Sequence, residues 1–150
     1  MIKVRDAKRS DINCIVEFQI NMAEETENLI LHEDVLLPGV QAVFEDHHKG
    51  RYFIAEYEGD IAGSLLVTYE WSDWRNGTVL WIQSVYVKHE YRGKGIFRAM
   101  YKHIQDILQT NPDLYKGLRL YVDKTNVAAQ KVYDSVGMNG NHYQLYEAMS

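Results

Sequence analysis

A short run of glycine and basic residues carries the clearest chemical signal in the sequence. It reads Arg92-Gly93-Lys94-Gly95 and lies between an apolar stretch and an amphipathic one. The first N–H groups of a helix have no partner within the helix and carry partial positive charge, so they can bind a phosphate. Glycines let the backbone approach the anion, and Arg92, Lys94 and Arg98 add formal charge. The run therefore predicts a phosphate-binding loop in front of a helix.

Two other kinds of phosphate loop are excluded by the residues around this run. A nucleoside triphosphate loop ends in Gly-Lys followed by Ser or Thr, and a dinucleotide loop needs a third glycine. Neither condition is met here. A plain glycine turn with solvated charges is the competing interpretation. The order of elements, an apolar strand, the loop and a strongly amphipathic helix, favours the phosphate site.

Hydrophobic periodicity predicts the elements that position this loop. We expect helices from the N-cap Ser10 to about 25–28, from near Pro38 to before Gly50, from 96 to before Asn111, and at 127–135 with Gly137 as the stop. We expect strands at 2–5, 52–57, 61–69, 78–87 and 118–122, with a last one possible at 143–148. Residues 70–77 are predicted to form a loop. This order indicates one mixed α/β sheet, and the length suits a single domain, residues 1–150.

Composition excludes several classes of protein. The net charge of −5 disfavours a nucleic-acid binder, which presents a basic face. No run of about 18 apolar residues exists, so we expect no membrane-spanning segment, and no secretory signal is recognisable. The single cysteine, Cys14, is expected to be a buried hydrophobe and favours a reducing, cytoplasmic setting. His47 and His48 lack further ligands at a recognised spacing, so no metal site is expected.

Two longer stretches resemble one known family. Residues 84–87 followed by 91–96 are similar to the acetyl-coenzyme A motif of the GNAT N-acetyltransferase superfamily, and residues 120–129 with Tyr133 and Gly137 are similar to its next motif. The resemblance implies an α/β (α+β) fold with a mixed, mostly antiparallel sheet and helices on both faces. It also implies acetyl-coenzyme A as co-substrate, no metal, and a homodimer.

The same resemblance implies roles for individual residues. Val85, Tyr86 and Val87 should offer backbone groups to the acetyl carbonyl and the pantetheine arm. Asn126 should hydrogen-bond the cofactor through its side chain, and Tyr133 should lie near the sulfur as general acid. The residues expected to surround the pyrophosphate, mainly through main-chain N–H groups, are Arg92, Gly93, Lys94, Gly95, Ile96, Phe97 and Arg98.

Acetyl transfer to an amine requires deprotonation of the amine, stabilisation of the oxyanion and protonation of the leaving thiolate. Tyr133 suits the last task, because a phenol with a pKa of about 10 is protonated at neutral pH. It lies about two helical turns from Asn126, so both can share one face. The base is open, since Gln83 and Ser84 stand where related enzymes often have a glutamate. A water chain could serve, or a carboxylate from Glu24, Glu25, Glu27, Glu70 or Asp73.

The acceptor is expected to bind at two groups of residues. Two tryptophans flank an aspartate in the segment 70–75, which suits a cationic amine and equally suits a packed turn. The spacing of this segment to Arg92 is similar to that in spermidine/spermine acetyltransferases, and the acidic run 24–27 would then face the same cleft. Gln83 and Ser84 replace acidic residues of those enzymes, which counts against polyamines. The candidate acceptor-binding residues are Glu25, Glu27, Glu70, Trp71, Asp73, Trp74, Gln83 and Ser84.

Three functions fit these observations. The first is an acetyl-coenzyme A-dependent N-acetyltransferase acting on a small cationic primary amine by direct attack on the thioester. The second is a catalytically weak domain that binds or senses acyl-coenzyme A, as Gln83 in place of a carboxylate would allow. The third is acetylation of a protein or peptide amine.

Overall fold

Five strands form one sheet in the computed structural model, which describes residues 1–150. All neighbouring strands are antiparallel except the last two, which are parallel, and their spatial order follows the chain. The mixed, mostly antiparallel sheet predicted from the sequence is therefore confirmed. The strands are β1 (Ile2–Asp6), β2 (Arg51–Tyr57), β3 (Asp60–Ser72), β4 (Gly77–Val87) and β5 (Tyr115–Arg119).

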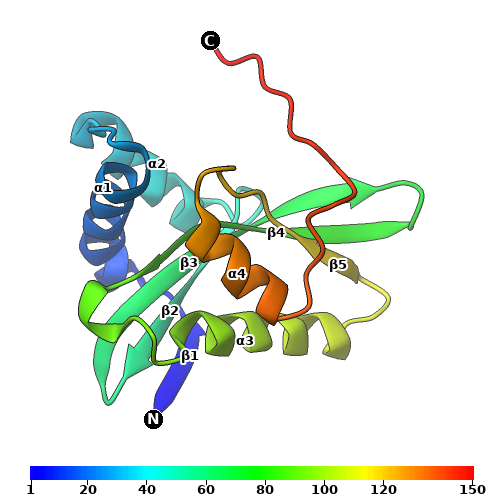
Figure 1. The fold of residues 1–150 in the computed structure, drawn as a ribbon, viewed down its shortest axis with the longest axis horizontal. Coiled ribbons are helices and arrows are strands. Elements are labelled where there is room, and N and C mark those ends of the chain that lie inside the picture. Colours follow the sequence, from blue (N-terminus) through cyan, green and yellow to red (C-terminus); the bar gives the residue numbers. More distant parts are fainter. The chain divides into compact units, whose positions relative to one another are not determined.

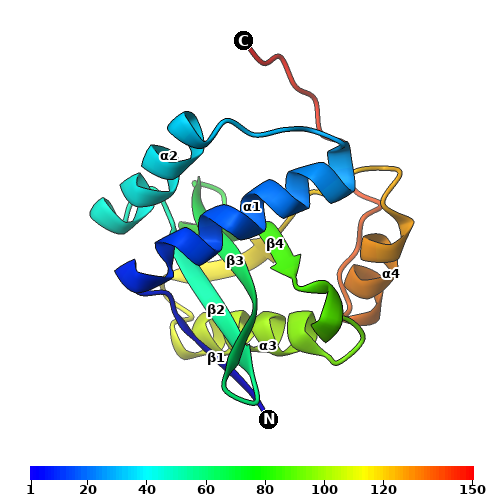
Figure 2. The same ribbon diagram turned by 90° about the vertical axis from the view of Figure 1, so that its left-hand side faces the viewer.

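Helices cover both faces of this sheet, as predicted (Figure 1). Tyr52 and Ile54 of β2 join the core formed with two helices, whereas Phe53 between them packs against His103 of a third helix. Alternate side chains of a strand point to opposite faces, which explains the two layers. Figure 2 shows the first helix crossing one face and the third lying along the other. These helices are α1 (Ile12–Glu27), α2 (Glu33–Glu45) and α3 (Ile96–Thr110).

A β-bulge interrupts the pairing of β3 with β4. Leu66 pairs with Gln83 and Ser64 pairs with Tyr86, so two residues of β4 lie opposite one residue of β3. One of these two, Ser84, has a positive φ of 53°. Because of the extra residue, Gln83 and Tyr86 point to the same face of the sheet instead of to opposite faces.

β5 covers only the first part of β4. Their parallel pairing begins at Thr78 and ends where Trp81 meets Arg119, the last residue of β5. A bulge bends the strand that carries it, which explains why the pairing stops just before the bulge. From Ile82 to Val87, β4 therefore has β3 on one side and no strand on the other. This open edge presents backbone N–H and C=O groups.

The chain divides into two compact units, Met1–Arg119 and Leu120–Ser150. The second contains α4 (Val127–Ser135), which begins after the N-cap Asn126. It ends in a Schellman motif, in which the N–H groups of Gly137 and Met138 bond back to the last turn. Both predicted ends of this helix are confirmed. That all 150 residues form one domain stays a prediction.

Some predicted boundaries are wrong. α2 begins at Glu33, and Pro38 lies inside it, because the acidic Glu33 and Asp34 favour a helix start. The predicted loop 70–77 shrinks to 73–76, because Trp71 pairs with Thr78 and continues the hairpin.

Two strand predictions also fail. The strand expected at 118–122 is instead β5, which ends at Arg119 where its pairing with β4 ends. Residues 143–148 form no strand, since no neighbouring strand supplies their hydrogen bonds. An alternating pattern alone does not make a strand without a partner edge.

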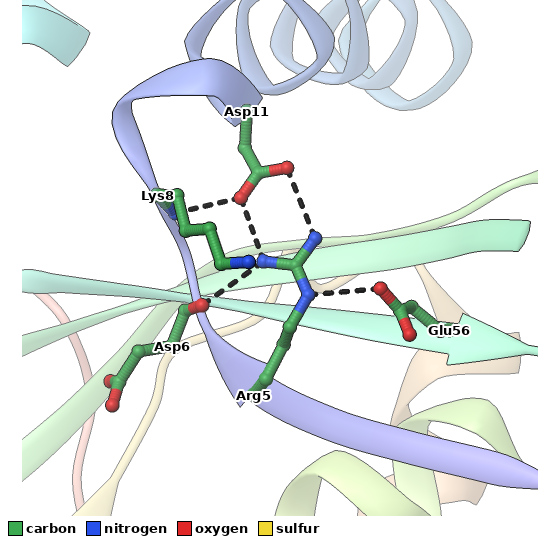
Figure 3. Close-up of polar contacts among 5 residues, drawn as sticks. All are labelled: Arg5, Asp6, Lys8, Asp11 and Glu56. Carbon is green, nitrogen blue, oxygen red and sulfur yellow. Dashed lines mark hydrogen bonds and ion pairs between the residues drawn. The ribbon is translucent and has the colours of Figure 1, made fainter. Parts of the chain in front are cut away.

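Arg5 connects its own strand, β1, to β2 and to the short helix η1 (Arg9–Asp11), as Figure 3 shows. Its guanidinium donates to both carboxylate oxygens of Asp11, at 2.8 and 3.1 Å, and to Glu56 at 2.9 Å. Asp11 also accepts from the N–H of Lys8 at 2.7 Å. The hydrogen bonds from Arg5 lower the pKa of the buried Asp11. Asp11, not the predicted Ser10, is the residue from which α1 begins.

Replacing Asp11 by asparagine is expected to lower the free energy of unfolding by about 1.5 kcal/mol near neutral pH, because a charged hydrogen-bonded partner of Arg5 is lost. Since Arg5 lowers the folded pKa of Asp11, this stabilisation is complete above the unfolded pKa of about 3.9 and is lost as pH falls through the folded pKa. Urea unfolding at several pH values should therefore show wild type and variant converging below about pH 4. Asp6→Asn, which breaks an exposed pair with Arg51, is the control and should cost less. Equal losses would contradict this role of Arg5.

Candidate active site

The open end of β4 is followed by the short helix η2 (His89–Tyr91) and then by the predicted phosphate loop. Gly93 and Gly95 have left-handed φ values of 77° and 83°, which only glycine adopts readily. Gly95 is the N-cap of α3 and has no side chain that could bond the first N–H groups of the helix. A Cβ on either glycine would meet no protein atom within 4 Å. The helix start therefore has both the donors and the open space that a phosphate needs.

Arg92, the first residue of the loop, is held by three protein groups. Its Nε donates to the backbone oxygen of Val87 at 2.9 Å, and its Nη2 lies 3.1 Å from a carboxylate oxygen of Glu25 in α1. Its guanidinium also lies over the ring of Tyr86, 5.5 Å from the centroid. Because Glu25 offsets the charge of Arg92, the attraction for an anion at this loop comes from main-chain N–H groups and Lys94 more than from Arg92.

The other predicted loop residues divide into buried and exposed ones. Ile96 and Phe97 bury their side chains in the core, which fixes the first turn of α3. Arg98 in the same turn is exposed. The Nζ of Lys94 lies 5.4 Å from the ring centroid of Tyr57, in a cation–π contact. These contacts anchor the loop against the sheet while its backbone stays exposed.

Tyr86 links β4 to the last turns of α1. Its ring packs against that of Phe18 of α1, with 5.2 Å between the ring centroids, and Arg92 lies over it. Burial raises its pKa, and the charge of Glu25 raises it further. Tyr86 is therefore neutral near pH 7, and its side chain joins α1, β4 and Arg92 into one cluster.

Gln83 and Ser84 occupy the bulge. The side-chain amide of Gln83 donates to the hydroxyl of Thr68 at 2.6 Å, across the β3–β4 pair. Ser84 has a strained, left-handed backbone, and Val85 follows it on the open edge of β4. Neither Gln83 nor Ser84 carries a group that ionises near neutral pH.

Glu70 is bonded to its neighbours on β4 and β5. It accepts a hydrogen bond from the indole N–H of Trp81 at 2.7 Å, and both its oxygens lie 2.9 Å from Arg119. The bonds from Trp81 and from Arg119 lower its pKa. A carboxylate that is stabilised as an anion is a weaker base.

The structure separates the two groups of predicted acceptor residues. Glu25 lies beside Tyr86, next to the last residue of β4, whereas Asp73 and Trp74 precede its first residue, Gly77. The intervening strand spans roughly 30 Å at about 3.3 Å per residue. The expectation that both groups face one cleft is therefore wrong. Trp74 is 90% exposed and lies at the turn of the hairpin.

Asn126 caps α4 and Tyr133 lies within it, both in the second unit. The side-chain oxygen of Asn126 accepts from the N–H of Ala129 at 3.1 Å, so Asn126 caps the helix. Tyr133 follows two turns later, and burial raises its pKa above the usual value of 10. It is therefore protonated at neutral pH, as a general acid must be.

The contacts that join α1 to the end of β4 were not predicted from the sequence. They bring Glu25 together with Arg92 across 67 positions of the chain, and they involve Phe18, which was not a candidate. One signal was present, however. Glu24, Glu25 and Glu27 lie at the C-terminal end of a helix, where the helix dipole disfavours carboxylates, so an external cation was to be expected.

Two further features bear on the chemistry. No three His, Cys, Asp or Glu side chains come together in a way that could hold a metal ion. None of the helices combines the length and the apolar character required to cross a membrane.

Comparison with known proteins places these features in context. The model of the Acetyltransferase (GNAT) family matches residues 18–138. Spermine/spermidine N(1)-acetyltransferase of Bacillus subtilis (strain 168) is 32% identical over 91 residues; the match covers 57% of this chain and 57% of that protein, a little over half of its length.

Two solved structures match this chain over nearly its whole length. The crystal structure of a possible acetyltransferase from Clostridium difficile 630 is 42% identical, covers 100% of this chain and 98% of its own, and has a TM-score of 0.90. A predicted acetyltransferase from Clostridium acetobutylicum, whose structure is described with acetyl-CoA, is 19% identical over 99% of this chain and 96% of its own. Its TM-score of 0.77 shows a likeness of fold.

Proposed function

The chain belongs to the acetyltransferase (GNAT) family, and from this premise we propose that it transfers an acetyl group from acetyl-coenzyme A to a primary amine on a small cationic molecule. One observation carries the proposal. The open edge of β4 at 82–87 is followed, after the short helix η2 (His89–Tyr91), by the left-handed Gly93 and Gly95 and the N-terminus of α3. A long donor with an acyl group at one end and a pyrophosphate further along suits an edge of backbone donors and acceptors that is followed by a helix N-terminus.

The donor would be bound mostly by main-chain groups. Backbone groups of Val85, Tyr86 and Val87 would bind the acetyl carbonyl and the pantetheine arm, and N–H groups from Gly93 to Arg98 would bind the pyrophosphate. The side-chain oxygen of Asn126 already caps α4, so Asn126 would contribute its amide N–H groups. The donor supplies an activated thioester.

In the reaction, the amine nitrogen attacks the thioester carbon, a C–N bond forms, the C–S bond breaks, and the amine gives up one proton. Tyr133 would donate its phenolic proton to the leaving sulfur. A backbone N–H on the open edge of β4 would stabilise the charge that develops on the carbonyl oxygen.

We infer that water carries the amine proton away. Gln83 and Ser84 cannot act as ordinary bases, and Glu70 is held as a weakly basic anion by Trp81 and Arg119. The rate would then depend mainly on the positioning of the two substrates, which can supply about 7–11 kcal/mol.

The acceptor would bind near the bulge of β4. The name of the Bacillus subtilis relative supports a cationic amine, although the match covers 57% of that protein. Glu27, Gln83 and Ser84 are the proposed acceptor residues at this end of β4. Two others, Glu25 and Glu70, are paired with arginines, and Trp71, Asp73 and Trp74 lie too far along the hairpin to touch an amine at Val85.

The setting proposed for this reaction is a homodimer in the cytoplasm. The single cysteine, Cys14, is partly buried, and burial raises the pKa of its thiol. A thiol that stays protonated and unpaired suits a reducing compartment.

The proposal is tested by binding and turnover together. Isothermal titration calorimetry should show that coenzyme A binds to the purified protein. A free-thiol assay with acetyl-coenzyme A should then show release of coenzyme A in the presence of at least one of spermine, spermidine, simple monoamines or aminoglycosides. Peptides with a free lysine or N-terminus belong in the same panel, as probes of the protein-acetylating alternative.

Each outcome of this test has one meaning. Thiol release with small amines supports the proposal. Tight binding of coenzyme A without thiol release across the panel overturns it in favour of an acyl-coenzyme A sensor. Release with peptides alone overturns the choice of acceptor, and absence of coenzyme A binding overturns the donor site itself.

A further inference from the structure

Glu25 is the one carboxylate in the last turn of α1 that has an ion-pair partner. Three glutamates lie there, Glu24, Glu25 and Glu27, and the turn contains no basic residue. The negative end of a helix dipole disfavours this arrangement. Only Glu25 pairs with a cation, and that cation is Arg92, the first residue of the donor loop. The pair therefore connects α1 to the donor loop.

The contacts of Glu25 converge on the end of β4. Its two oxygens lie 3.1 and 3.4 Å from Nη2 of Arg92, whose guanidinium lies over the ring of Tyr86. Tyr86 lies on β4 just after the bulge and is buried. A single side chain of α1 thus holds the first residue of the loop, which in turn lies over the ring of Tyr86 on β4.

Arg92 needs such a partner because the loop that it begins is rich in glycine. Two residues of this loop are left-handed glycines, and glycine has more conformational freedom to lose than any other residue. The Nε bond to Val87 fixes one side of the guanidinium, and the ring of Tyr86 covers its face. Glu25 binds Nη2, at the other end of the guanidinium. These contacts together fix the place from which Gly93 to Gly95 turn towards α3.

We propose that Glu25 is a positioning residue for the donor: through Arg92 it holds the loop Arg92–Gly95 in the conformation that binds the pyrophosphate of acetyl-coenzyme A. This role differs from the acceptor-binding role expected from the sequence, and it rests on the proposed function. Glu25 itself contacts neither the amine nor the acetyl group. Its effect is on donor affinity, with the chemical step unchanged.

The test compares Glu25→Ala with Glu25→Gln. Glutamine keeps an oxygen for Arg92 and loses the charge, whereas alanine loses both. The dissociation constant of coenzyme A, measured by calorimetry, is expected to rise about fivefold for alanine and about twofold for glutamine, since the ion pair is partly exposed. The KM for acetyl-coenzyme A should rise in parallel, while kcat and the KM for the amine change less than about twofold. Thermal unfolding of both variants checks that the fold is intact.

Two further variants sharpen the result. Glu17→Ala removes another exposed glutamate of α1, two turns from Glu25, and should leave all constants unchanged. Arg92→Ala should weaken coenzyme A binding, and adding Glu25→Ala to it should weaken binding no further, because the two residues act as a unit.

Three results would overturn the inference. The first is a dissociation constant for coenzyme A that is unchanged in Glu25→Ala, and the second is a rise in the KM for the amine alone. The third is a lower dissociation constant, which would mean that Glu25 holds Arg92 away from the anion. These are separate from failure of the proposed function, which would appear as absence of coenzyme A binding by the wild-type protein.

Discussion

Replacing Tyr133 by phenylalanine is expected to lower kcat about a hundredfold, the lower end of the range for loss of a general acid or base. The substitution removes one hydroxyl and keeps the ring, so the packing of α4 should be preserved. The KM for acetyl-coenzyme A should change little, since the phenol is proposed to act on the sulfur only as the C–S bond breaks. Steady-state kinetics with the amine found in the thiol assay measures both constants.

The pKa of Tyr133 gives this prediction a second readout. Burial raises the pKa above 10, so the phenol is protonated throughout the neutral range. The ratio of wild-type to variant kcat should therefore be constant from about pH 7 to about pH 9, because deprotonation of Tyr133 begins only above that range. A ratio that falls across this range would mean that Tyr133 loses its proton there, which would contradict the raised pKa.

Tyr146→Phe is the matched control. Tyr146 lies in the same unit but is 87% exposed, and its hydroxyl contacts only Gln144 among the residues nearby. Its loss should leave kcat within about twofold of wild type. Equal activity of Tyr133→Phe and Tyr146→Phe would remove Tyr133 from the mechanism.

The second large effect is expected from Gly63→Ala in β3. A Cβ on Gly63 would lie 2.5 Å from the backbone oxygen of Tyr86 and 3.3 Å from the Cα of Val87. Both contacts are with backbone, so β3 and β4 would have to move apart. The free energy of unfolding should fall by roughly 2–3 kcal/mol, as in overpacked cores. Urea unfolding measures this loss.

The same substitution should weaken binding of coenzyme A, because the displaced segment is the open edge proposed to bind the donor. Gly117→Ala in β5 is the control, since a Cβ there would meet no atom within 4 Å. That variant should be as stable as wild type and should bind coenzyme A as tightly. A stable Gly63→Ala with unchanged binding would contradict the close approach of the two strands.

The sequence was most informative where one element carries a complete local signal. α3 follows the predicted range because its apolar residues keep helical spacing up to Asn111, and its loop glycines mark its start. α4 also matches, because Asn126 and Gly137 supply both caps. In these elements the residues that decide the structure are neighbours in the chain.

Predictions failed where residues distant in the sequence determine the local structure. β3 and β4 continue through Trp71 and Thr78 because each strand gives the other its hydrogen bonds, which overrides the polar character of residues 70–77. The site shows the same limit. Glu25 was a candidate for the acceptor and for the base, whereas its contact with Arg92 becomes visible only when α1 is packed on the sheet.

The β3–β4 hairpin has a practical consequence for spectroscopy. It contains all three tryptophans of the chain, Trp71, Trp74 and Trp81. Trp71 and Trp74 are 63% and 90% exposed, so their emission should change little on unfolding, whereas Trp81 is half-buried and bonded to Glu70. A change in intrinsic tryptophan fluorescence therefore reports mainly on the surroundings of Trp81, and so on the unfolding of the unit Met1–Arg119 alone. Leu120–Ser150 contains no such fluorophore, so loss of α4 would be followed by far-ultraviolet circular dichroism. Coincidence of the two curves would indicate one cooperative domain.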